Sequence, residues 1–256
     1  MIVDSHGHVS TSRFDADRDA VLQRAREAGL VALLDVGCDL ESSRASVALA
    51  EREPLVWATV GVHPHEAKDV PADYLDQLRA LAQHPKVVGI GEMGLDFFYD
   101  HSPRDEQRER FRQQLELARE LDLPAVLHVR DAYPEAAGIL DEVPGVRGVA
   151  HCFTGTAEEA ELYWRRGFAV SFTGVVTFKS ADQVREAAKG VPPELLLIET
   201  DCPYMAPVPL RGKRCEPAHV VHTGRKLAEV RGEDPDVLLR RAAENTLRVF
   251  GIPAPE

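Results

Sequence analysis

The run Val87-Val-Gly-Ile-Gly-Glu92 is followed by a long segment with helical periodicity, Pro103–Leu121, and then by a second apolar run, Ala125-Val-Leu-His-Val129. Neither short run alternates regularly between polar and apolar residues, as expected for strands that are buried on both faces of a parallel sheet. Within the segment between them, apolar residues recur three or four positions apart, which indicates a helix with one buried face. This stretch predicts the strand–helix–strand unit of an α/β protein.

The same alternation continues in both directions along the chain. Six further apolar runs are predicted strands, at Ile2–Asp4, Val31–Val36, Leu55–Gly61, Arg147–His151, Phe168–Phe172 and Leu195–Glu199. Helical patterns lie between most of them, at Asp15–Ala28, Ser42–Arg52, Pro71–Ala82, Thr156–Arg166 and Ala181–Lys189. Two more helices are predicted after the last strand, at Pro217–Val230 and Pro235–Phe250. Pro71 is expected in the first turn of its helix, and Thr156 is expected to cap the next one.

Eight strands that alternate with helices over 256 residues predict an α/β fold, a (β/α)8 TIM barrel with extra C-terminal helices. Residues 1–256 are predicted to form a single domain, because no linker or low-complexity segment interrupts the pattern. A doubly wound open sheet would give the same alternation. The chain has no glycine-rich phosphate loop after its first strand, which weakens the nucleotide-binding version of that alternative.

The composition limits the kinds of partner. The chain has 30 Lys and Arg against 42 Asp and Glu, a formal net charge of −12, which argues against a general nucleic-acid coat or a binder of anionic membranes. No apolar run approaches the roughly 20 residues of a membrane span. The four cysteines form no C-x-x-C pair, which argues against a zinc knuckle. A chain of this size needs no disulfide bonds to be stable, so we expect a reducing compartment. We expect a cytoplasmic protein with no membrane partner and no obligate protein partner.

Histidines gather where the predicted strands end, which is the rim that carries the active site in such barrels. Six of the ten histidines lie there, namely His6, His8, His63, His65, His128 and His151. Glu92 and Asp201 occupy similar positions after two other strands. A single histidine is more often structural than a ligand. Six of them at one rim, together with two carboxylates, predict a metal site.

The spacing of His6 and His8 supports this prediction. Residues two apart on a strand face the same side, so the two imidazoles can converge on one cation at about 2.0–2.1 Å each. A His-x-His pair alone is common, but here a histidine from each of two other strands and a carboxylate from the eighth accompany it. Imidazole and carboxylate ligands suit Zn²⁺, Mn²⁺, Fe²⁺ or Co²⁺, and Mg²⁺ remains open as well.

This arrangement resembles the amidohydrolase-like metal-dependent hydrolases. Members of that group with two metals often bridge them with a carbamylated lysine after the fourth strand. In this sequence the fourth strand ends in Glu92 instead. A carboxylate has two oxygens and can join two cations without modification.

Ordered motifs along the whole chain narrow the resemblance. They are Gly-Val-His-Pro-His (61–65), Gly-Glu-Met-Gly-Leu-Asp (91–96), His-Val-Arg (128–130), His-Cys-Phe-Thr-Gly (151–155), Thr-Phe-Lys (177–179), Glu-Thr-Asp-Cys-Pro-Tyr (199–204), Arg-Gly-Lys-Arg (211–214) and Glu-Asn-Thr (244–246). In this order they resemble the motifs of the TatD family of metal-dependent deoxyribonucleases. The resemblance extends from Asp4 to Phe250.

The resemblance implies two divalent metal ions and a role for each ligand. His6, His8, Glu92 and Asp201 would hold the first ion. Glu92 would bridge to a second ion, held with His128 and His151. Asp201 could also orient the attacking water, and Glu199 is a candidate for proton transfer. The alternative for Glu199 is that it only orients a metal ligand.

The predicted substrate contacts are basic and aromatic residues near the same rim. A local basic lip is expected from Arg130, Lys179, Arg211, Lys213 and Arg214, with His63 and His65 as further donors to phosphate oxygens. The alternative for the lip is ordinary solvated surface charge. Tyr204, Phe97, Phe98 and Phe153 could stack on bases, although for any one of them packing in the core is the favoured interpretation.

Two positions depart from the family pattern. Val9-Ser10 follows the second histidine, where family members commonly have Leu-Asp, which puts the shape of that loop in doubt. Cys215 stands where the family commonly has asparagine, between Arg214 and Glu216, and it would weaken any positioning role of that asparagine.

The resemblance implies a hydrolase that cleaves phosphodiester bonds of DNA by metal-activated water. A narrow basic lip on an acidic body favours exonucleolytic action on single-stranded or frayed 3′ ends over a tight grip on long duplex. One alternative is an ester or amide hydrolase on the same metals, such as a D-aminoacyl-tRNA deacylase. A second alternative is a non-catalytic metal-binding or scaffold protein, against which the complete ligand set argues.

Overall fold

The computed structural model describes residues 1–254 and contains one parallel sheet of eight strands in the order β1 to β8. The strands are β1 (Ile2–Gly7), β2 (Leu30–Val36), β3 (Val56–Val60), β4 (Val87–Asp96), β5 (Ala125–Arg130), β6 (Gly148–Ala150), β7 (Ala169–Phe172) and β8 (Leu196–Ile198). Sequential order with parallel pairing throughout is the topology of a (β/α)8 barrel, so the predicted fold class is confirmed and the doubly wound sheet is excluded.

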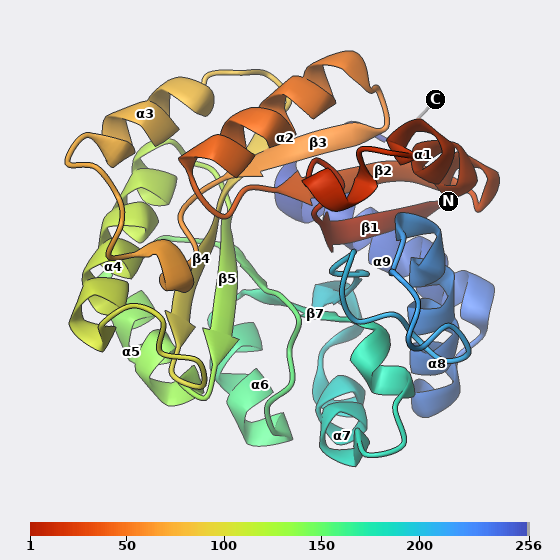
Figure 1. The fold of residues 1–256 in the computed structure, drawn as a ribbon. Coiled ribbons are helices and arrows are strands. Elements are labelled where there is room, and N and C mark those ends of the chain that lie inside the picture. The colour runs from red at the N-terminus through yellow and green to blue at the C-terminus, as the bar shows by residue number, and fades with distance from the viewer. Residues whose placement is uncertain (255–256) are drawn as a thin grey trace.

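Helices form a ring outside the strands (Figure 1). They are α1 (Arg18–Glu27), α2 (Leu40–Arg52), α3 (Tyr74–Leu81), α4 (Arg104–Glu120), α5 (Tyr133–Glu142), α6 (Ala157–Trp164), α7 (Asp182–Gly190), α8 (Val220–Arg231) and α9 (Pro235–Phe250). Short 3₁₀ turns occur at Ser12–Phe14, Pro64–Glu66, Gly174–Thr177, Pro193–Leu195 and Pro217–His219. The two helices after the last strand, α8 and α9, confirm the predicted C-terminal addition.

The barrel closes between its last and first strands through a few backbone contacts. A single bridge joins Gly7 to Cys202. The Asp201 N–H donates to the His6 carbonyl at 2.9 Å, and the His8 N–H donates to the Cys202 carbonyl at 2.7 Å. These bonds hold the segment after β8 against the end of β1, so they place Asp201 beside the His-x-His pair.

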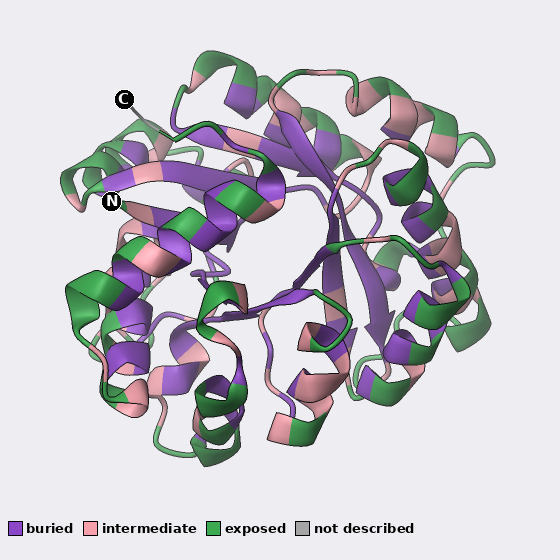
Figure 2. Ribbon diagram, turned by 180° about the vertical axis from the view of Figure 1, so that it is seen from behind, coloured by how far each residue is buried: buried purple, intermediate pink, exposed green. Residues whose placement is uncertain are grey.

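Two hydrophobic clusters support the barrel. The larger one packs the outer faces of the strands against the helices, and it accounts for the buried sheet visible from behind in Figure 2. The smaller one contains an apolar residue from nearly every strand and continues into α9 through Ala243, Leu247 and Phe250. The C-terminal helix therefore covers barrel residues and leaves the opposite rim, at the strand ends, available for a site.

Several predicted bounds were wrong by a few residues, and one helix was not predicted. The segment at Tyr133–Glu142 forms α5, with Pro134 in its first turn. Pro71 does not open a helix, because α3 begins only at Tyr74, whose N–H donates to the Pro71 carbonyl in a preceding turn. Thr156 does cap α6, since its side chain accepts from the Glu159 N–H while Glu159 reaches back to the Thr156 N–H.

Among residues 1–254, no helix combines the length and the apolar character needed to cross a membrane. The extension of a single domain to residue 256 stays a prediction, since positions 255 and 256 lie outside the described residues.

Candidate metal centre

The carboxyl ends of the strands surround a cavity of about 610 Å³. Imidazoles and carboxylates line it, among them His8, His63, Glu92, His128, His151 and Asp201. These residues come from strands that are far apart in the sequence, and the barrel brings them to one rim. Three groups of described residues are close enough to hold a cation, and two of these groups share Glu92.

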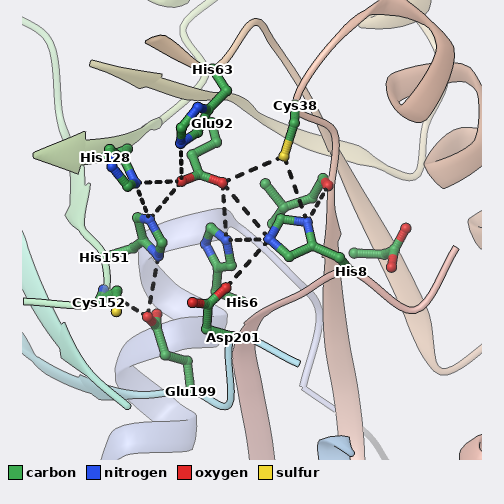
Figure 3. Close-up of polar contacts among 12 residues, drawn as sticks. His6, His8, Cys38, His63, Glu92, His128, His151, Cys152, Glu199 and Asp201 are labelled. Carbon is green, nitrogen blue, oxygen red and sulfur yellow. Dashed lines mark hydrogen bonds and ion pairs between the residues drawn. The ribbon is translucent and has the colours of Figure 1, made fainter. Parts of the chain in front are cut away.

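The carboxylate of Glu92 lies between two sets of histidines (Figure 3). Its Oε2 atom is 3.4 Å from His6 Nε2 and 3.8 Å from His8 Nε2. Its Oε1 atom is 2.8 Å from both His128 Nδ1 and His151 Nε2. Each oxygen of one buried carboxylate therefore faces its own histidine pair.

The first pair has a spacing that suits a cation. The Nε2 atoms of His6 and His8 lie 3.3 Å apart. Two ligands at about 2.0–2.1 Å in a tetrahedral site are separated by roughly 3.4 Å. Asp201 completes this side of the cavity, with its Oδ1 atom 3.4 Å from His8 Nε2.

Backbone and carboxylate partners orient the histidines of the cavity. His8 Nδ1 is 2.8 Å from the Val36 carbonyl, which can only accept, so His8 keeps its Nε2 lone pair for the cavity. His128 Nε2 lies 3.2 Å from Asp96 Oδ2, which leaves Nδ1 of that ring facing Glu92. Outer partners of this kind fix the tautomer of metal-ligating histidines.

His151 and His6 complete the pattern. His151 Nδ1 is 3.3 Å from Glu199 Oε1, so its Nε2 faces Glu92. The His6 ring stacks on the His151 ring with centroids 3.8 Å apart. His6 Nδ1 is fully buried without a hydrogen-bond partner among the described residues. The His6 Nε2 atom, three oriented rings and two carboxylates form a donor set that fits divalent cations.

The electrostatics of the cluster keep Glu92 ionised. Burial disfavours the ionised form of Glu92, but the charges of His151 and His63 and the hydrogen bonds from His128 and His151 hold its pKa well below the usual range. Burial alone would lower the pKa of His151, whereas the charges of Glu92 and Glu199 raise it to about 10. Glu92 is therefore an anion that the surrounding imidazoles stabilise.

Glu199 lies behind the cluster. It is completely buried, and its Oε1 accepts the Cys152 N–H at 2.7 Å besides lying near His151 Nδ1. It does not line the cavity, whereas Asp201 does. Glu199 also forms, with His6 and His151, one of the three groups close enough to hold a cation, and its predicted roles in proton transfer or in orienting a metal ligand stay predictions.

Asp96 is a site residue that the sequence reasoning missed. Its carboxylate is fully buried and lies 2.9 Å from His65 Nε2 as well as 3.2 Å from His128 Nε2. Burial opposes ionisation, but these histidines and the Tyr99 N–H lower its pKa far below the usual value. One feature of the sequence could have indicated Asp96. It lies at the end of the same strand as Glu92, two residues after Gly94, which pairs with His128 on the neighbouring strand.

His63, predicted as a substrate contact, forms with Glu92 and His128 one of the three groups close enough to hold a cation. Its Nε2 is 3.4 Å from Glu92 Oε1, while its Nδ1 accepts the His65 N–H at 3.1 Å. Burial and the charge of His128 lower the pKa of His63 to about 4. The ring is therefore neutral at pH 7 with its proton on Nε2, which makes it a hydrogen-bond donor toward the cavity.

Two other predicted substrate contacts reach the cavity. Arg130 lines it, and its guanidinium stacks on the Phe98 ring at 4.2 Å and on the Tyr99 ring at 4.9 Å. Tyr204 also lines it and is 47% exposed, with Arg13 over its ring at 5.1 Å. Phe153, in contrast, is buried in the core.

The rest of the predicted basic lip does not line the cavity, namely Lys179, Arg211, Lys213 and Arg214. Arg214 is held by Asp17 at 2.6 Å and by Glu216 at 3.2 Å. The Arg211 guanidinium lies 3.9 Å from the centroid of the Phe178 ring.

The two departures from the family pattern are accommodated locally. The N–H groups of Val9 and Ser10 both donate to Asp35 Oδ1, which pins the loop after His8. Cys215 is buried, and its N–H donates to the Pro203 carbonyl at 3.1 Å, next to the segment that carries Asp201.

Comparisons with known proteins agree with the fold and the site. The family described as TatD related DNase matches residues 3–251. A protein from Bacillus subtilis named uncharacterized metal-dependent hydrolase YabD is 39% identical over 98% of this chain and all of its own length. A protein from Citrobacter koseri named 3′-5′ ssDNA/RNA exonuclease TatD is 40% identical over 96% of this chain and 97% of its own length.

A solved structure is similar over the same extent. The Escherichia coli TatD homologue YjjV superimposes with a TM-score of 0.93 at 30% identity, and the match covers 98% of both chains. An organophosphorus hydrolase mutant, at 13% identity and a TM-score of 0.67, shares the fold.

The barrel and its histidine–carboxylate clusters define the amidohydrolase-like class of metal-dependent hydrolases. Within that class the chain belongs to the TatD family, as the match over residues 3–251 shows. The family that the sequence motifs indicated is therefore confirmed, and the chain is a metal-dependent hydrolase of that family with clusters able to bind metal.

Proposed function

We propose that this protein hydrolyses phosphodiester bonds of DNA, acting as an exonuclease on single-stranded or frayed 3′ ends with two divalent cations. The observation that carries the proposal is the position of Glu92, whose two oxygens face two separate histidine pairs at the floor of an open cavity. The relatives named 3′-5′ ssDNA/RNA exonucleases support the choice of substrate.

The ligands divide between the two oxygens of Glu92. We assign His6, His8 and Asp201 to the cation on the Oε2 side. We assign His128 and His151 to the cation on the Oε1 side, because both lie 2.8 Å from that oxygen. Zn²⁺, Mn²⁺, Mg²⁺, Fe²⁺ and Co²⁺ all accept such ligands. Held by these residues, a divalent cation would lower the pKa of water enough to supply hydroxide near neutral pH and would offset charge on phosphoryl oxygens.

Two carboxylates are proposed to accept a proton from the attacking water, and Asp201 is the better placed of the two. It lines the cavity and lies 3.4 Å from His8 Nε2, so its oxygen can accept a proton from a water molecule in the cavity. Glu199 is fully buried against His151 and the Cys152 N–H, so its contribution is to hold the His151 ring.

Substrate binding would use the polar groups on the cavity wall. The His63 Nε2–H and the Arg130 guanidinium are donors for phosphate oxygens, and the exposed Tyr204 ring offers a face for a base. His65 is bound to Asp96 and supports His63 through its backbone N–H. Lys179, Arg211 and Lys213 remain proposed contacts for phosphates farther along the strand.

The acidic body limits the grip on nucleic acid. The net charge is −12 and few basic side chains lie near the cavity, so the protein is expected to bind long duplex weakly. We expect rapid digestion of single-stranded oligonucleotides with free 3′ ends and slow or no cleavage of closed circular duplex. Equal rates on the two substrates would contradict this substrate preference.

The same metal site could act on an ester or amide, including a D-aminoacyl ester of tRNA. A parallel assay separates these activities: a labelled single-stranded DNA, the matching RNA and a D-aminoacyl ester, each with added cation and with chelator. The proposal predicts cation-dependent cleavage of the DNA. Hydrolysis of the ester without cleavage of either oligonucleotide would overturn it.

A further inference from the structure

We propose that Phe98 and Tyr99, in the segment after β4, form a stacking surface for one of the two bases that flank the scissile phosphate, while the Tyr204 ring contacts the other base. The inference rests on the proposed function and deepens it, because it gives a reason why the substrate must be single-stranded. A base can stack on a side chain at the rim only after it has left its own base pair, so two aromatic surfaces require two unpaired nucleotides at the point of cleavage.

The exposed aromatic side chains of the protein gather around the cavity. Phe98, Tyr99 and Tyr204 are 56%, 50% and 47% exposed, and no other phenylalanine, tyrosine or tryptophan in residues 1–254 is exposed. Tyr99 and Tyr204 line the cavity, and the Phe98 ring meets the Tyr99 ring edge to face with centroids 4.8 Å apart. Phe97, in contrast, packs against the hydrophobic core. Single exposed apolar side chains need no explanation, but three around one cavity indicate a contact surface.

Tyr99 belongs to the side of the cavity that holds the second histidine pair. Its ring packs edge-on against the His65 ring, with centroids 5.6 Å apart. His65 Nε2 lies 2.9 Å from Asp96 Oδ2, and the same oxygen lies 3.2 Å from His128 Nε2. A continuous set of contacts therefore joins the Tyr99 ring to His128, a proposed ligand of the cation on the Glu92 Oε1 side.

Tyr204 belongs to the opposite side of the cavity. Its ring lies near the His8 ring, with centroids 6.4 Å apart. His8 and His128 lie on opposite sides of the Glu92 carboxylate (Figure 3). The two aromatic surfaces therefore flank the two proposed cation positions. A phosphodiester bound between the cations has one nucleoside on each side, so each nucleoside would extend toward one aromatic surface.

The stacking surface after β4 is ordered without any substrate. The N–H groups of Phe98 and Tyr99 both donate to Asp96 Oδ1, at 3.0 and 2.9 Å. The other side of the segment is supported as well, because the Tyr99 and His101 rings stack with centroids 5.5 Å apart and an angle of 15° between their planes. A surface that is ordered before it binds a base loses less conformational entropy on binding.

Arg130 adds a charged group to the same surface. Its guanidinium lies 4.2 Å from the centroid of the Phe98 ring and 4.9 Å from that of the Tyr99 ring. A guanidinium stacked on an aromatic ring keeps the N–H groups at its edge available for a phosphate. The rings and the guanidinium therefore offer neighbouring contacts for a base and for a phosphate, which is the chemistry of an unpaired nucleotide rather than of an apolar peptide.

The test measures kcat/KM for removal of the 3′ nucleotide from a single-stranded oligothymidylate with added cation. One thymine, at the last or the penultimate position, is replaced by 5,6-dihydrothymine, which keeps the hydrogen-bonding edge of thymine but is neither aromatic nor planar. Stacking uses the π face of the base. The wild-type protein is therefore expected to lose roughly 5- to 100-fold in kcat/KM for a replacement at either position.

Two double variants remove the proposed surface. F98A/Y99A is expected to lose roughly 5- to 100-fold in kcat/KM on the unmodified oligonucleotide. At one of the two positions the saturated base should then cause no further loss, because no ring remains there to contact it. F98L/Y99L should be impaired to a similar extent, since leucine keeps apolar bulk without an aromatic face. V237A removes an exposed side chain of α9 and is the matched control, which should keep the wild-type value.

Circular dichroism checks the fold of each variant, and gel filtration checks the oligomeric state. Wild-type kcat/KM in F98A/Y99A or in F98L/Y99L would overturn the proposal. An equal loss with the saturated base in the wild-type protein and in F98A/Y99A at both positions would overturn it as well. So would a wild-type dimer that separates in F98A/Y99A, since the rings would then belong to a contact between two copies. In all these cases the wild-type protein still digests DNA and the proposed function stands, whereas failure of the wild-type protein to digest DNA with added cation overturns both.

Discussion

At the scale of single residues, the centre depends on groups that touch no substrate. Asp96 accepts from His65 and His128, and its other oxygen accepts the N–H groups of Phe98 and Tyr99 at 3.0 and 2.9 Å. It therefore couples the loop after β4 to the orientation of His128, one of the proposed metal ligands. Buried carboxylates behind metal-binding histidines commonly have this function.

Replacing Asp96 by asparagine tests this coupling. The amide keeps an acceptor for the two N–H groups but presents an NH₂ group to His128, which reverses the tautomer and moves the proton onto Nδ1. We expect cation affinity to fall by about 10- to 100-fold with little loss of secondary structure. Metal titration and circular dichroism measure the two effects, and unchanged affinity would contradict the assigned role.

Variants of Arg130 and Arg214 form a matched pair that tests which basic residues contact the phosphates of the substrate. Arg130 lines the cavity, while Arg214 is occupied by Asp17 and Glu216. Loss of a charged hydrogen bond to phosphate should raise KM in R130A by roughly tenfold. R214A should leave KM near the wild-type value. Steady-state kinetics on a single-stranded oligonucleotide measures both KM values. A larger rise of KM in R214A than in R130A would support the basic lip that the sequence predicted.

The sequence identified ligand residues better than it identified their neighbours. His6, His8, His128 and His151 could be found because histidine is rare and a strand end is recognisable. Asp96 belongs to a common residue type, and its significance comes from the two histidine nitrogens that the barrel brings within 4 Å of its carboxylate. Arg214 looked like a phosphate contact because one-dimensional spacing carries no information about Asp17, which lies almost 200 residues away.

At the scale of elements, the end of β3 must pass very close to β4. A Cβ added to Gly61 would lie 2.5 Å from the Cα of Gly91, immediately before Glu92. Glycine is therefore required where the two strands bring His63 and Glu92 together. Gly138, inside α5, has no neighbour within 4 Å of such an added atom.

These two glycines give opposite predictions for the same substitution. G61A should lower the free energy of unfolding by about 1–3 kcal/mol and weaken cation binding, because β4 must shift. G138A should raise it by about 0.5–1 kcal/mol without affecting the cations. Denaturant unfolding with and without added cation checks both, and a G61A protein that binds cations normally would contradict the close packing argued for β3 and β4.

Helix α4 was predictable from its periodicity, although it has no side-chain cap, and α6 from its cap at Thr156. Helix α5, which contains Pro134 and Gly138, was not predicted. The proline sits in the first turn, where its missing N–H is harmless, and the glycine is tolerated because Ile139 and Leu140 bury the helix against the barrel. Tertiary packing, rather than local helix propensity, therefore accounts for α5.

At the scale of the whole molecule, the centre links strands that are distant in sequence. Its proposed ligands come from β1, β4, β5 and the ends of β6 and β8, and β8 meets β1 through only a few backbone bonds. Bound cations should therefore stabilise the closed barrel as well as take part in the chemistry.

Chelation should lower the melting temperature accordingly. A cation at about 100 times its dissociation constant adds about 2.7 kcal/mol, which corresponds to roughly 5–10 °C in a protein of this size. The difference should be much smaller in E92Q, whose amide cannot bridge two cations as a carboxylate does. Calorimetry with and without chelator measures it, and an equal shift in both proteins would argue against Glu92 as a shared ligand.

The most direct test of the central claim is digestion of a single-stranded DNA carrying a label at its 3′ or 5′ end, by wild-type protein and by E92Q of known cation content. The account predicts cation-dependent, stepwise shortening from the 3′ end by the wild-type protein and its loss with chelator or in E92Q. Equal digestion by both proteins would contradict it, as would cleavage that does not depend on a divalent cation.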